Sequence, residues 1–258
     1  MIKVTPVPAF NDNYLWMVEG TELGNAAVVD PGDAAPIEAW LTENGRTLTS
    51  ILITHHHADH VGGVERLKES YPAARVFGPD DPRISMVEEK LSDNDKIQLE
   101  DLGLEFKVLF VPGHTSHHIA YLGHGSLFCG DTMFAGGCGR VFCGTMKDLN
   151  SSLQRLSKLP DETLVYCAHE YTMANIAFAR MVEGDENTDL VRREKSDADK
   201  RAIGIPTVPT TIGVERKTNP FLRVDEPLVK KIAEQKAGTQ LLEQWQVFEA
   251  LRLWKDQA

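Results

Sequence analysis

The sequence has no long apolar run, and this shortage limits where the protein can reside. No stretch of the 258 residues approaches the roughly 18 consecutive apolar residues that a membrane-spanning helix needs. The first ten residues, M-I-K-V-T-P-V-P-A-F, also lack the apolar core of a secretory signal. We therefore expect a cytoplasmic protein that has no membrane partner.

Cysteine is scarce as well. The four cysteines, Cys129, Cys138, Cys143 and Cys167, form no C-x-x-C pair. In a reducing compartment an isolated cysteine usually behaves as a small buried apolar residue. The sequence therefore predicts neither a disulfide framework nor a redox motif.

Basic residues are outnumbered by acidic ones. Lysine and arginine together number 27 against 38 aspartates and glutamates, which gives a formal net charge of −11. A field of this sign repels polyanions, so nucleic acid and acidic membranes are disfavoured as partners. A small anionic substrate would need a local basic cluster to capture it.

The first half of the chain alternates short apolar runs with helical patterns. Strands are predicted at residues 26–29, 50–53, 106–111, 120–122 and 126–129. Helices are predicted at residues 36–44 and 61–71, the first followed by glycine and the second closed by proline. Strands that alternate with helices favour a layered α/β core.

The pattern changes near residue 170. Helical periodicity or charge density marks residues 171–183, 188–201, 227–236 and 239–255, and residues 205–220, rich in threonine and proline, are predicted to be an irregular connection. The sequence therefore predicts an α/β domain at residues 1–169 and an all-helical domain at 170–258.

The nine histidines all lie between positions 55 and 169, and four of them fall in one motif. A short apolar strand runs into T-H-H-H-A-D-H at residues 54–60. If the chain is still extended there, His55 and His57 point the same way and reach one metal ion. Asp59 and His60 follow the turn and face a second ion. Imidazole with carboxylate suits zinc, iron or manganese.

Three more candidate ligands follow apolar runs further along the chain. They are His114, Asp131 and His169, and each is expected to emerge at the same edge of a sheet. Taken alone, each would more often be a turn, cap or core residue. Their occurrence after the motif at residues 54–60 indicates seven ligands for two ions, whereas the alternative is a solvated histidine cluster.

Four motifs together resemble one family. T-H-H-H-A-D-H at residues 54–60, P-G-H-T at 112–115, G-D-T at 130–132 and A-H-E-Y at 168–171 are similar to the glyoxalase II branch of the metallo-β-lactamase superfamily. The resemblance spans the whole chain. It implies an αββα sandwich with a C-terminal helical domain, and hydrolysis of S-2-hydroxyacylglutathione thioesters in the second step of methylglyoxal detoxification.

The resemblance also implies how the ligands are shared. One ion is assigned to His55, His57 and His114, the other to Asp59, His60 and His169, and Asp131 bridges the two. Asp59 and Asp131, with a metal-bound hydroxide, then carry the catalysis. A net positive inner shell would favour the oxyanion of the transition state. Zinc is the expected metal of the pair, and iron or manganese would also suit it.

The substrate residues follow from the same resemblance. The loop at residues 135–140 is similar to a glutathione-binding loop and points to Arg140, and Tyr171 matches a second glutathione contact. Arg252 and Lys255, spaced to share a helix face, would bind glutathione carboxylates. Without the family, the loop is a flexible turn, Tyr171 an ordinary helix-start aromatic and the basic pair a solvated helix end.

Two positions depart from the family pattern, and other functions stay open. Phe142 stands where tyrosine is frequent, and His117 where glycine is frequent. The alternatives are a glutathione-persulfide dioxygenase that uses one iron, a nucleic-acid-processing or other superfamily hydrolase, and an inactive metal-binding scaffold. We expect a monomer that acts on a small glutathione thioester.

Overall fold

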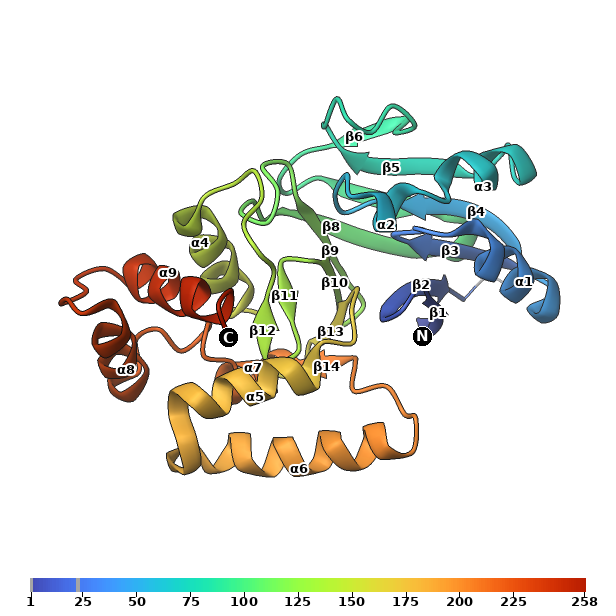
Figure 1. The fold of residues 1–258 in the computed structure, drawn as a ribbon. Helices are drawn as coiled ribbons and strands as arrows, with labels where there is room; N and C mark the ends of the chain where they lie inside the picture. Colours follow the sequence, from blue (N-terminus) through green and yellow to red (C-terminus); the bar gives the residue numbers. More distant parts are fainter. Residues whose placement is uncertain (1, 22–23) are drawn as a thin grey trace. The chain divides into compact units, whose positions relative to one another are not determined.

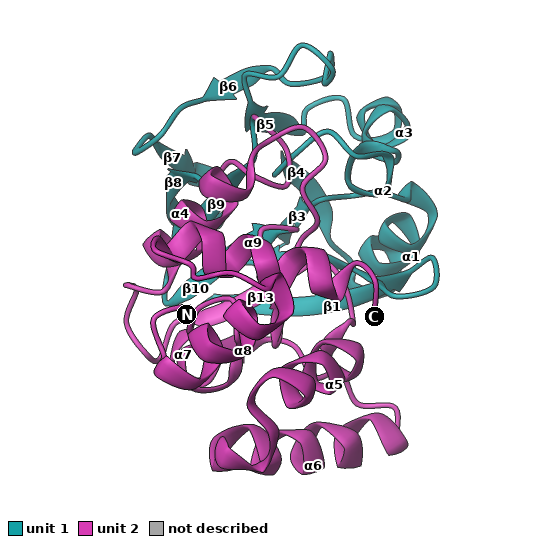
Figure 2. Ribbon diagram, turned by 60° about the vertical axis from the view of Figure 1, so that its left-hand side comes forward, with its two compact units in different colours: residues 1–110, 117–130 teal, residues 111–116, 131–258 magenta. Residues whose placement is uncertain are grey.

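The computed structural model describes residues 2–21 and 24–258, which belong to two compact units. Unit 1 comprises Met1–Phe110 and His117–Gly130, and unit 2 comprises Val111–Ser116 and Asp131–Ala258 (Figure 2). Compactness therefore groups residues 131–169 with the C-terminal helices. The domain boundary at residue 170 stays a prediction from the order of elements along the chain.

A mixed sheet forms the first layer of unit 1. Its six strands follow the chain in the order β1-β2-β3-β4-β5-β6, antiparallel from β1 to β3 and parallel from β3 onward. Their bounds are β1 Lys3–Ala9, β2 Asn13–Glu19, β3 Asn25–Val29, β4 Thr47–Leu52, β5 Arg75–Pro79 and β6 Glu89–Leu91. The strands predicted at residues 26–29 and 50–53 correspond to β3 and β4.

Helices α1 (Ala34–Asn44) and α3 (Val64–Ser70) bury their apolar sides against this sheet (Figure 1). Ile37 and Leu41 of α1 and Leu67 of α3 belong to the same buried cluster as Val28 and Ile51 of the strands. The Asp33 side chain caps α1 by accepting from the Ala35 amide at 3.0 Å. The cap and Gly45, left-handed with φ of 58°, set the ends of this helix, which ends at residue 44 as predicted but begins at residue 34 rather than 36.

Antiparallel strands form the second layer of unit 1. They run in the order β10-β9-β8-β7, with bounds β7 Lys96–Leu99, β8 Leu104–Phe110, β9 Ile119–Gly123 and β10 Ser126–Gly130; a short 3-10 helix spans Glu100–Leu102. Tyr121, fully buried on β9, donates its hydroxyl to the carbonyl of Ile53 at 2.8 Å, which joins this layer to the end of β4. The predicted α/β layering is thus present within unit 1.

Unit 2 is mainly helical. It contains the hairpin β11 Met133–Phe134 and β12 Gly137–Cys138, the pair β13 Leu164–Cys167 and β14 Thr210–Thr211, a 3-10 turn at Gly184–Glu186, and the helices α4 Met146–Leu156, α5 Thr172–Glu183, α6 Thr188–Ala202, α7 Ile212–Thr218, α8 Pro227–Ala237 and α9 Gln244–Lys255 (Figure 1). The helices predicted at 171–183, 188–201 and 227–236 correspond to α5, α6 and α8. Among the described residues no helix combines the length and the apolar character that crossing a membrane would require.

Three predicted elements were wrong in detail. The helix predicted at residues 61–71 is broken into α2 (Ala58–Val61) and α3 by Gly62 and Gly63. A Cβ on Gly63 would lie 2.6 Å from the Ala34 nitrogen and 2.7 Å from the Pro31 carbonyl, so the chain must pass too close here for a side chain.

The other two errors lie in unit 2. The segment 205–220 is not irregular throughout, because Thr211 caps α7 by accepting from the Val214 amide at 3.2 Å. The last helix begins at Gln244 rather than 239, since a reciprocal capping box of Glu243 and Gln246 sets its start. Helix α4 was not predicted at all, although Thr145 and Asp148 carry its capping signal.

Candidate metal centre

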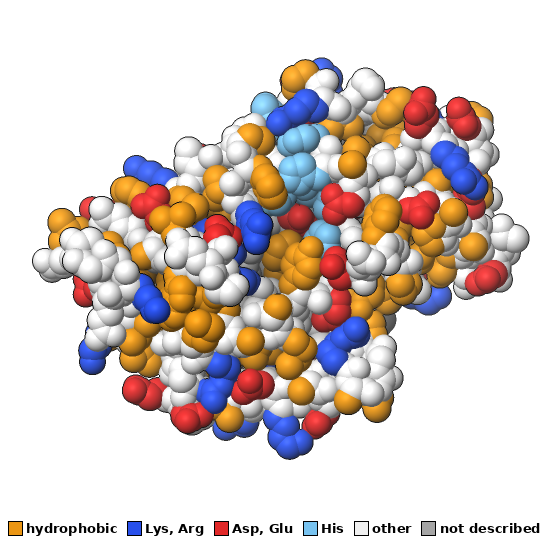
Figure 3. Space-filling view, in the orientation of Figure 1, with side chains coloured by type: hydrophobic (Ala, Val, Ile, Leu, Met, Phe, Trp, Pro, Cys, Tyr) orange, Lys and Arg blue, Asp and Glu red, His pale blue; other side chains and the backbone are white. Residues whose placement is uncertain are grey.

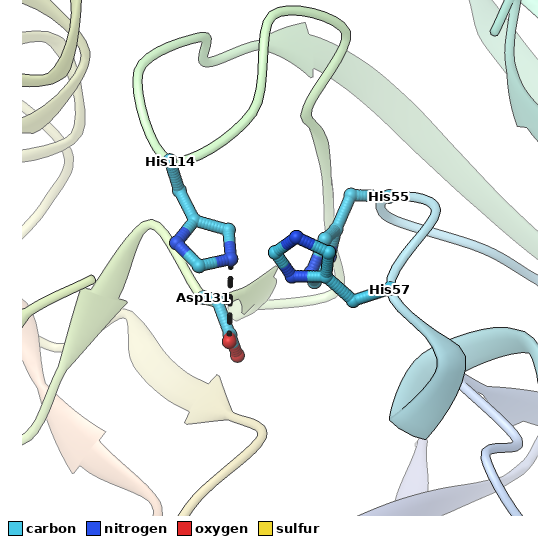
Figure 4. Close-up of side chains that lie close together, drawn as sticks. All are labelled: His55, His57, His114 and Asp131. Atoms are coloured by element: carbon cyan, nitrogen blue, oxygen red, sulfur yellow. Dashed lines mark hydrogen bonds and ion pairs between the residues drawn. The ribbon is translucent and has the colours of Figure 1, made fainter. Parts of the chain in front are cut away.

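The first group of candidate ligands joins three imidazoles and one carboxylate. His55, His57, His114 and Asp131 each place one ligand atom within 4.8 Å of those of the others. Figure 4 shows these four side chains turned toward a common point. His55 Nε2 lies 3.0 Å from His57 Nδ1, as expected for alternate positions of an extended chain after β4.

The second group joins one carboxylate and two imidazoles. Asp59, His60 and His169 place their ligand atoms within the same 4.8 Å. Asp59 and His60 lie on α2, so the turn into this short helix redirects them away from the extended segment before it. Asn13 Nδ2 donates to Asp59 Oδ2 at 3.1 Å and holds that carboxylate in place. Histidine side chains are visible beside acidic ones on the face drawn in Figure 3.

Asp131 has one oxygen directed at a histidine of each group. Its Oδ2 lies 3.5 Å from His114 Nε2, and its Oδ1 lies 3.5 Å from His169 Nε2. A carboxylate in this orientation presents one oxygen to each of two neighbouring cation sites. The bridging role that the family resemblance implies for Asp131 stays a prediction, and this orientation is compatible with it.

The donor chemistry fits two first-row divalent ions. Nitrogen and carboxylate ligands lie about 2.0–2.2 Å from zinc, so two ligands of one ion are at most about 4.4 Å apart. The spacing of up to 4.8 Å within each group exceeds this limit by only a few tenths of an ångström. Both groups mix imidazole with carboxylate, which suits zinc, iron and manganese alike. The structure therefore brings together two metal-binding clusters, as expected of a binuclear centre.

The imidazole of His60 has an acidic partner that the sequence prediction did not identify. Asp30 Oδ2 lies 3.1 Å from His60 Nδ1, and the same carboxylate accepts from the Thr54 amide and hydroxyl, each at 2.8 Å. A carboxylate at Nδ1 fixes the ring so that Nε2 faces the ligand group. Asp30 itself has a φ of 52°, which is rare outside glycine. In the sequence Asp30 opens a D-P-G turn directly after an apolar run, which marks the end of the strand but does not identify a partner for His60.

His114 is oriented by the backbone of a loop. Its Nδ1 donates to the carbonyl of Arg140 at 2.8 Å, so Nε2 faces Asp131. Phe142, the residue that departs from the family pattern, packs its ring edge against His114 at 5.2 Å between centroids. At this position phenylalanine therefore supports the His114 ring through an apolar contact.

His169 is held by aromatic rings. The Tyr171 ring stacks on it with centroids 4.7 Å apart and an interplanar angle of 3°. Phe134 contacts both rings edge to face, at 5.7 Å from His169 and 5.2 Å from Tyr171. Tyr171, predicted as a glutathione contact, is thus also a packing partner of a candidate ligand.

The remaining four histidines belong to neither group. His118 stacks on the His55 ring at 4.6 Å and its Nδ1 donates to the Ile119 carbonyl at 3.0 Å. His56 Nδ1 lies 3.3 Å and His117 Nδ1 3.8 Å from the same carboxylate oxygen of Asp81. His124 accepts from the Glu105 amide at 3.2 Å in its turn. None of these four histidines is among the seven candidate ligands named from the sequence.

The predicted substrate residues lie in different surroundings. Arg140 is 66% exposed, and its Nε lies 3.2 Å from Asp256 Oδ1. Arg252 is only 2% exposed and donates to the Cys138 carbonyl and to Asp256 Oδ1, each at 3.1 Å. Arg252 and Lys255 do share a helix face, since their charged ends lie 5.2 and 5.9 Å from the centroid of the Phe221 ring.

The surroundings of Lys255 disfavour the charged form of its side chain. Burial and the neighbouring Arg252 guanidinium lower the pKa of the Lys255 ammonium from 10.5 to about 8. Its Nζ donates to Asn175 Oδ1 and lies 5.8 Å from the centroid of the Phe178 ring. A lysine kept where its charge costs stability is a frequent feature of functional sites.

Replacing Asp30 with alanine should weaken metal binding without removing a ligand. The His60 ring would lose the partner at Nδ1, and losses of this kind typically lower metal affinity about 10- to 100-fold. Titration of the metal-free variant with zinc, followed by a competing chelator, measures this. Asp81→Ala, which removes a carboxylate from His56 and His117 instead, is the matched control; an equal loss in both variants would contradict the assignment.

Comparison with known proteins agrees with this geometry. Residues 11–169 match the family model described as "Metallo-beta-lactamase superfamily", and residues 170–258 match "Hydroxyacylglutathione hydrolase C-terminus". A hydroxyacylglutathione hydrolase of Nitrosomonas eutropha is 47% identical over 256 residues, covering 99% of both chains. One of Pseudomonas fluorescens is 48% identical over 257 residues, again covering 99% of both.

Solved structures give the same fold. The crystal structure of ETHE1 from Myxococcus xanthus matches with a TM-score of 0.64 at 25% identity, covering 99% of this chain and 98% of that one. TTHA1623, solved in a di-iron-bound form, matches with a TM-score of 0.62 at 27% identity, covering 85% of this chain and 100% of that one. The fold is therefore the metallo-beta-lactamase fold with a C-terminal helical region, as the sequence predicted. With family models and full-length relatives in agreement, the chain belongs to the hydroxyacylglutathione hydrolases, or glyoxalase II enzymes, of the metallo-beta-lactamase superfamily.

Proposed function

We propose that this chain hydrolyses S-2-hydroxyacylglutathione thioesters and converts S-D-lactoylglutathione into D-lactate and glutathione, the second step of methylglyoxal detoxification. The proposal rests on the two ligand groups that Asp131 faces with both oxygens, in a chain that is 47% identical over its length to a protein named for this activity. Residues 1–169 would form the catalytic domain and 170–258 the substrate-binding domain of a cytoplasmic monomer.

The seven side chains of the two groups are the proposed metal ligands. His55, His57 and His114 would hold one ion, Asp59, His60 and His169 would hold the other, and Asp131 would be shared between them. When bound, two divalent ions supply an activated water at neutral pH and polarise a carbonyl oxygen. Zinc is the proposed metal, and iron or manganese fits the same donors.

The two aspartates and their partners prepare the site for an ester-like substrate. Asp59 and Asp131 add two negative charges among the histidines. They would offset only part of the charge of two divalent ions, and the remaining positive charge would favour an oxyanion. Asn13 fixes the direction of the Asp59 carboxylate through the bond at 3.1 Å. Water adds to the thioester carbonyl, the C–S bond breaks, and the sulfur leaves as a thiolate that takes up a proton from solvent. Because a thiolate is a good leaving group, the chain needs no strong general acid.

Arg140, Tyr171, Arg252 and Lys255 are the proposed glutathione-binding residues. The exposure of Arg140 and the contact of Tyr171 with a candidate ligand support a role for each in binding substrate. Lys255 offers an ammonium that burial has stripped of part of its hydration. Arg252 is engaged with the Cys138 carbonyl, so its contribution would come through the loop at 135–140 as well as through its charge.

The purified protein should carry close to two metal ions per chain. Two separate ligand groups give two sites, and the full set of nitrogens and oxygens suffices for two ions of ordinary coordination number. Elemental analysis of protein whose activity is measured in the same sample checks this. Fully active protein with one ion or fewer per chain would refute the binuclear assignment.

The substrate is tested by thiol release. S-D-lactoylglutathione should be hydrolysed with liberation of one thiol per molecule, detected by a thiol reagent, and removal of metal by a chelator should abolish the reaction until zinc is restored. Glutathione persulfide with an oxygen electrode is the counter-assay. Oxygen consumption without thioester hydrolysis would contradict the proposal.

A further inference from the structure

Glu215, on α7 of unit 2, is a completely buried carboxylate with four hydrogen-bonding or charged partners. It is 0% exposed. Its Oε1 lies 2.7 Å from Arg193 NH2 and accepts from the Thr210 hydroxyl at 2.8 Å. Its Oε2 accepts from the Gly136 amide at 2.8 Å and from Asn219 Nδ2 at 2.9 Å.

The Arg193 guanidinium makes this burial tolerable. Arg193 is also buried, and it divides its charge between Glu215 and Asp197, whose Oδ2 lies 3.2 Å from its Nε. A buried carboxylate costs several kcal/mol of desolvation unless it is paired and its lone pairs are satisfied. A buried ion pair adds little to the net stability of a protein, because an apolar pair of the same volume in its place is often at least as stabilising. A contribution to stability alone therefore does not explain why a carboxylate is buried at Glu215.

Glu215 directs one oxygen at the backbone of a loop, residues 135–140, and the same loop is held by other helices. Asn175 Nδ2 of α5 donates to the Ala135 carbonyl at 3.0 Å, and Asn219 Nδ2 donates to the Gly137 carbonyl at 2.9 Å. Arg252 of α9 donates to the Cys138 carbonyl. Side chains from three helices thus fix consecutive backbone groups of one loop.

The loop has glycines where this contact requires them. Gly136 has a φ of 71°, which favours glycine, and its amide faces Glu215. A Cβ on Gly137 would lie 2.5 Å from Asn175 Cγ. At Gly137 the backbone therefore lies too close to the Asn175 side chain of α5 for a larger residue.

The far end of the loop reaches the candidate centre. The Arg140 carbonyl accepts from His114 Nδ1 at 2.8 Å. A Cβ on Gly139 would lie 2.0 Å from the Asp131 carbonyl and 2.9 Å from His114 Nδ1. A displacement of the loop would therefore move the acceptor that orients His114, and with it the exposed Arg140 side chain.

From these contacts we infer that Glu215 is a positioning residue. By accepting from the Gly136 amide, it holds the 135–140 loop in the position in which the Arg140 carbonyl orients His114 and the Arg140 side chain can meet substrate. Arg193, 2.7 Å from Glu215, is the charged partner of this carboxylate. The inference rests on the proposed function for its kinetic consequence, but the loop contact itself does not.

The test compares Glu215→Gln with Glu183→Gln. Glu183 is also buried, at 3% exposed, and its ion-pair and hydrogen-bond partners Arg223 and Asn187 lie outside the loop. Both substitutions keep the shape of the side chain and remove one buried negative charge. Any effect of a weakened helical region should therefore occur in both variants.

Two measurements are made on each full-length, metal-loaded variant. Amide hydrogen exchange of the peptide covering residues 131–142 should be accelerated about 10-fold or more in Glu215→Gln and unchanged in Glu183→Gln, because loss of a charge-assisted bond frees the Gly136 amide. KM for S-D-lactoylglutathione should rise about 10-fold in the first variant only, measured well below the melting temperature of both. If Glu215→Gln does not fold, Thr210→Val removes one donor to the same carboxylate and should show the same changes about threefold.

The outcomes separate the two proposals. If wild-type protein does not hydrolyse the thioester, the proposed function fails, and the exchange comparison still decides the role of Glu215. Equal exchange of the 131–142 peptide in wild type, Glu215→Gln and Glu183→Gln would overturn the inference. Accelerated exchange with an unchanged KM would overturn the link between loop position and substrate binding.

Discussion

Asp131→Ala should weaken metal binding at both ligand groups and lower kcat/KM by at least about 1,000-fold. The substitution removes the carboxylate whose two oxygens lie 3.5 Å from His114 and from His169. Two cations about 3.5–4 Å apart repel each other, and a shared carboxylate offsets that repulsion as well as binding each ion. A 1,000-fold loss corresponds to about 4 kcal/mol of transition-state stabilisation.

The measurement is metal content together with steady-state kinetics. Asp131→Ala should retain at most one ion per chain after gel filtration, and its folded structure should be checked by circular dichroism. Glu183→Ala removes another buried carboxylate of unit 2 that belongs to neither ligand group, and its metal content should equal that of wild type. Retention of both ions and of the full rate by Asp131→Ala would show that this carboxylate does not bridge.

The sequence predicted the ligand set because its chemistry is local. His55 and His57 occupy alternate positions after β4, and Asp59 and His60 follow on a turn, so four members depend on one short segment. His114, Asp131 and His169 each follow an apolar run that ends a strand. The structure brings all seven into two groups, without any long-range information having been needed to name them.

The partners of these ligands could not be predicted in the same way. Asp30 is 24 residues before Thr54, which it holds, and 30 before His60, so only the folded sheet brings them together. Glu215 is 79 residues from Gly136 and accepts a hydrogen bond from its amide. Neither contact follows a local periodicity, because each is set by which strands and helices pack together. Because residues 205–220 were predicted to be an irregular connection, the prediction also missed α7, the helix that carries Glu215.

The errors in the predicted helices have two kinds of cause, one tertiary and one local. Gly62 and Gly63 stand inside an otherwise helical pattern, and the close approach to Pro31 and Ala34 that demands Gly63 is visible only in three dimensions. By contrast, Thr211 before Val214 and the Glu243–Gln246 box are capping signals of the kind that sequence analysis can use. The many prolines and threonines of residues 205–220 led to the prediction of an irregular segment, so the Thr211 cap was not recognised.

Lys255→Met should raise KM for S-D-lactoylglutathione about 10- to 100-fold with kcat nearly unchanged, and should raise the melting temperature at pH 7. An ammonium that binds a substrate carboxylate equally in ground and transition states contributes to KM alone. One charge-assisted hydrogen bond of about 1.5–3 kcal/mol gives this range. Stability should rise because methionine fills the same space without a charge beside Phe178 and Arg252.

The pH dependence has a definite sign. The folded protein holds Lys255 with a pKa of about 8, below the 10.5 of the unfolded chain, so the folded state binds fewer protons between these values. The destabilisation is therefore complete below pH 8 and disappears as pH rises toward 10.5. After allowance for solvent screening of a partly exposed side chain, the gain from Lys255→Met is roughly 2 kcal/mol at pH 7. The stabilising effect of the variant should vanish near pH 10.

The same pKa predicts the kinetics of the wild-type enzyme. As pH rises through about 8, Lys255 loses its proton and KM should increase, whereas Lys255→Met should show no such step. Lys236→Met is the matched control, because Lys236 lies over the Trp254 ring at 4.3 Å as an exposed lysine and should change neither KM nor its pH profile. A thioester lacking the glutathione carboxylates should be hydrolysed equally by wild type and Lys255→Met. If both substrates lost activity equally, Lys255 would support the end of α9 rather than recognise glutathione, and its lowered pKa would reflect packing alone.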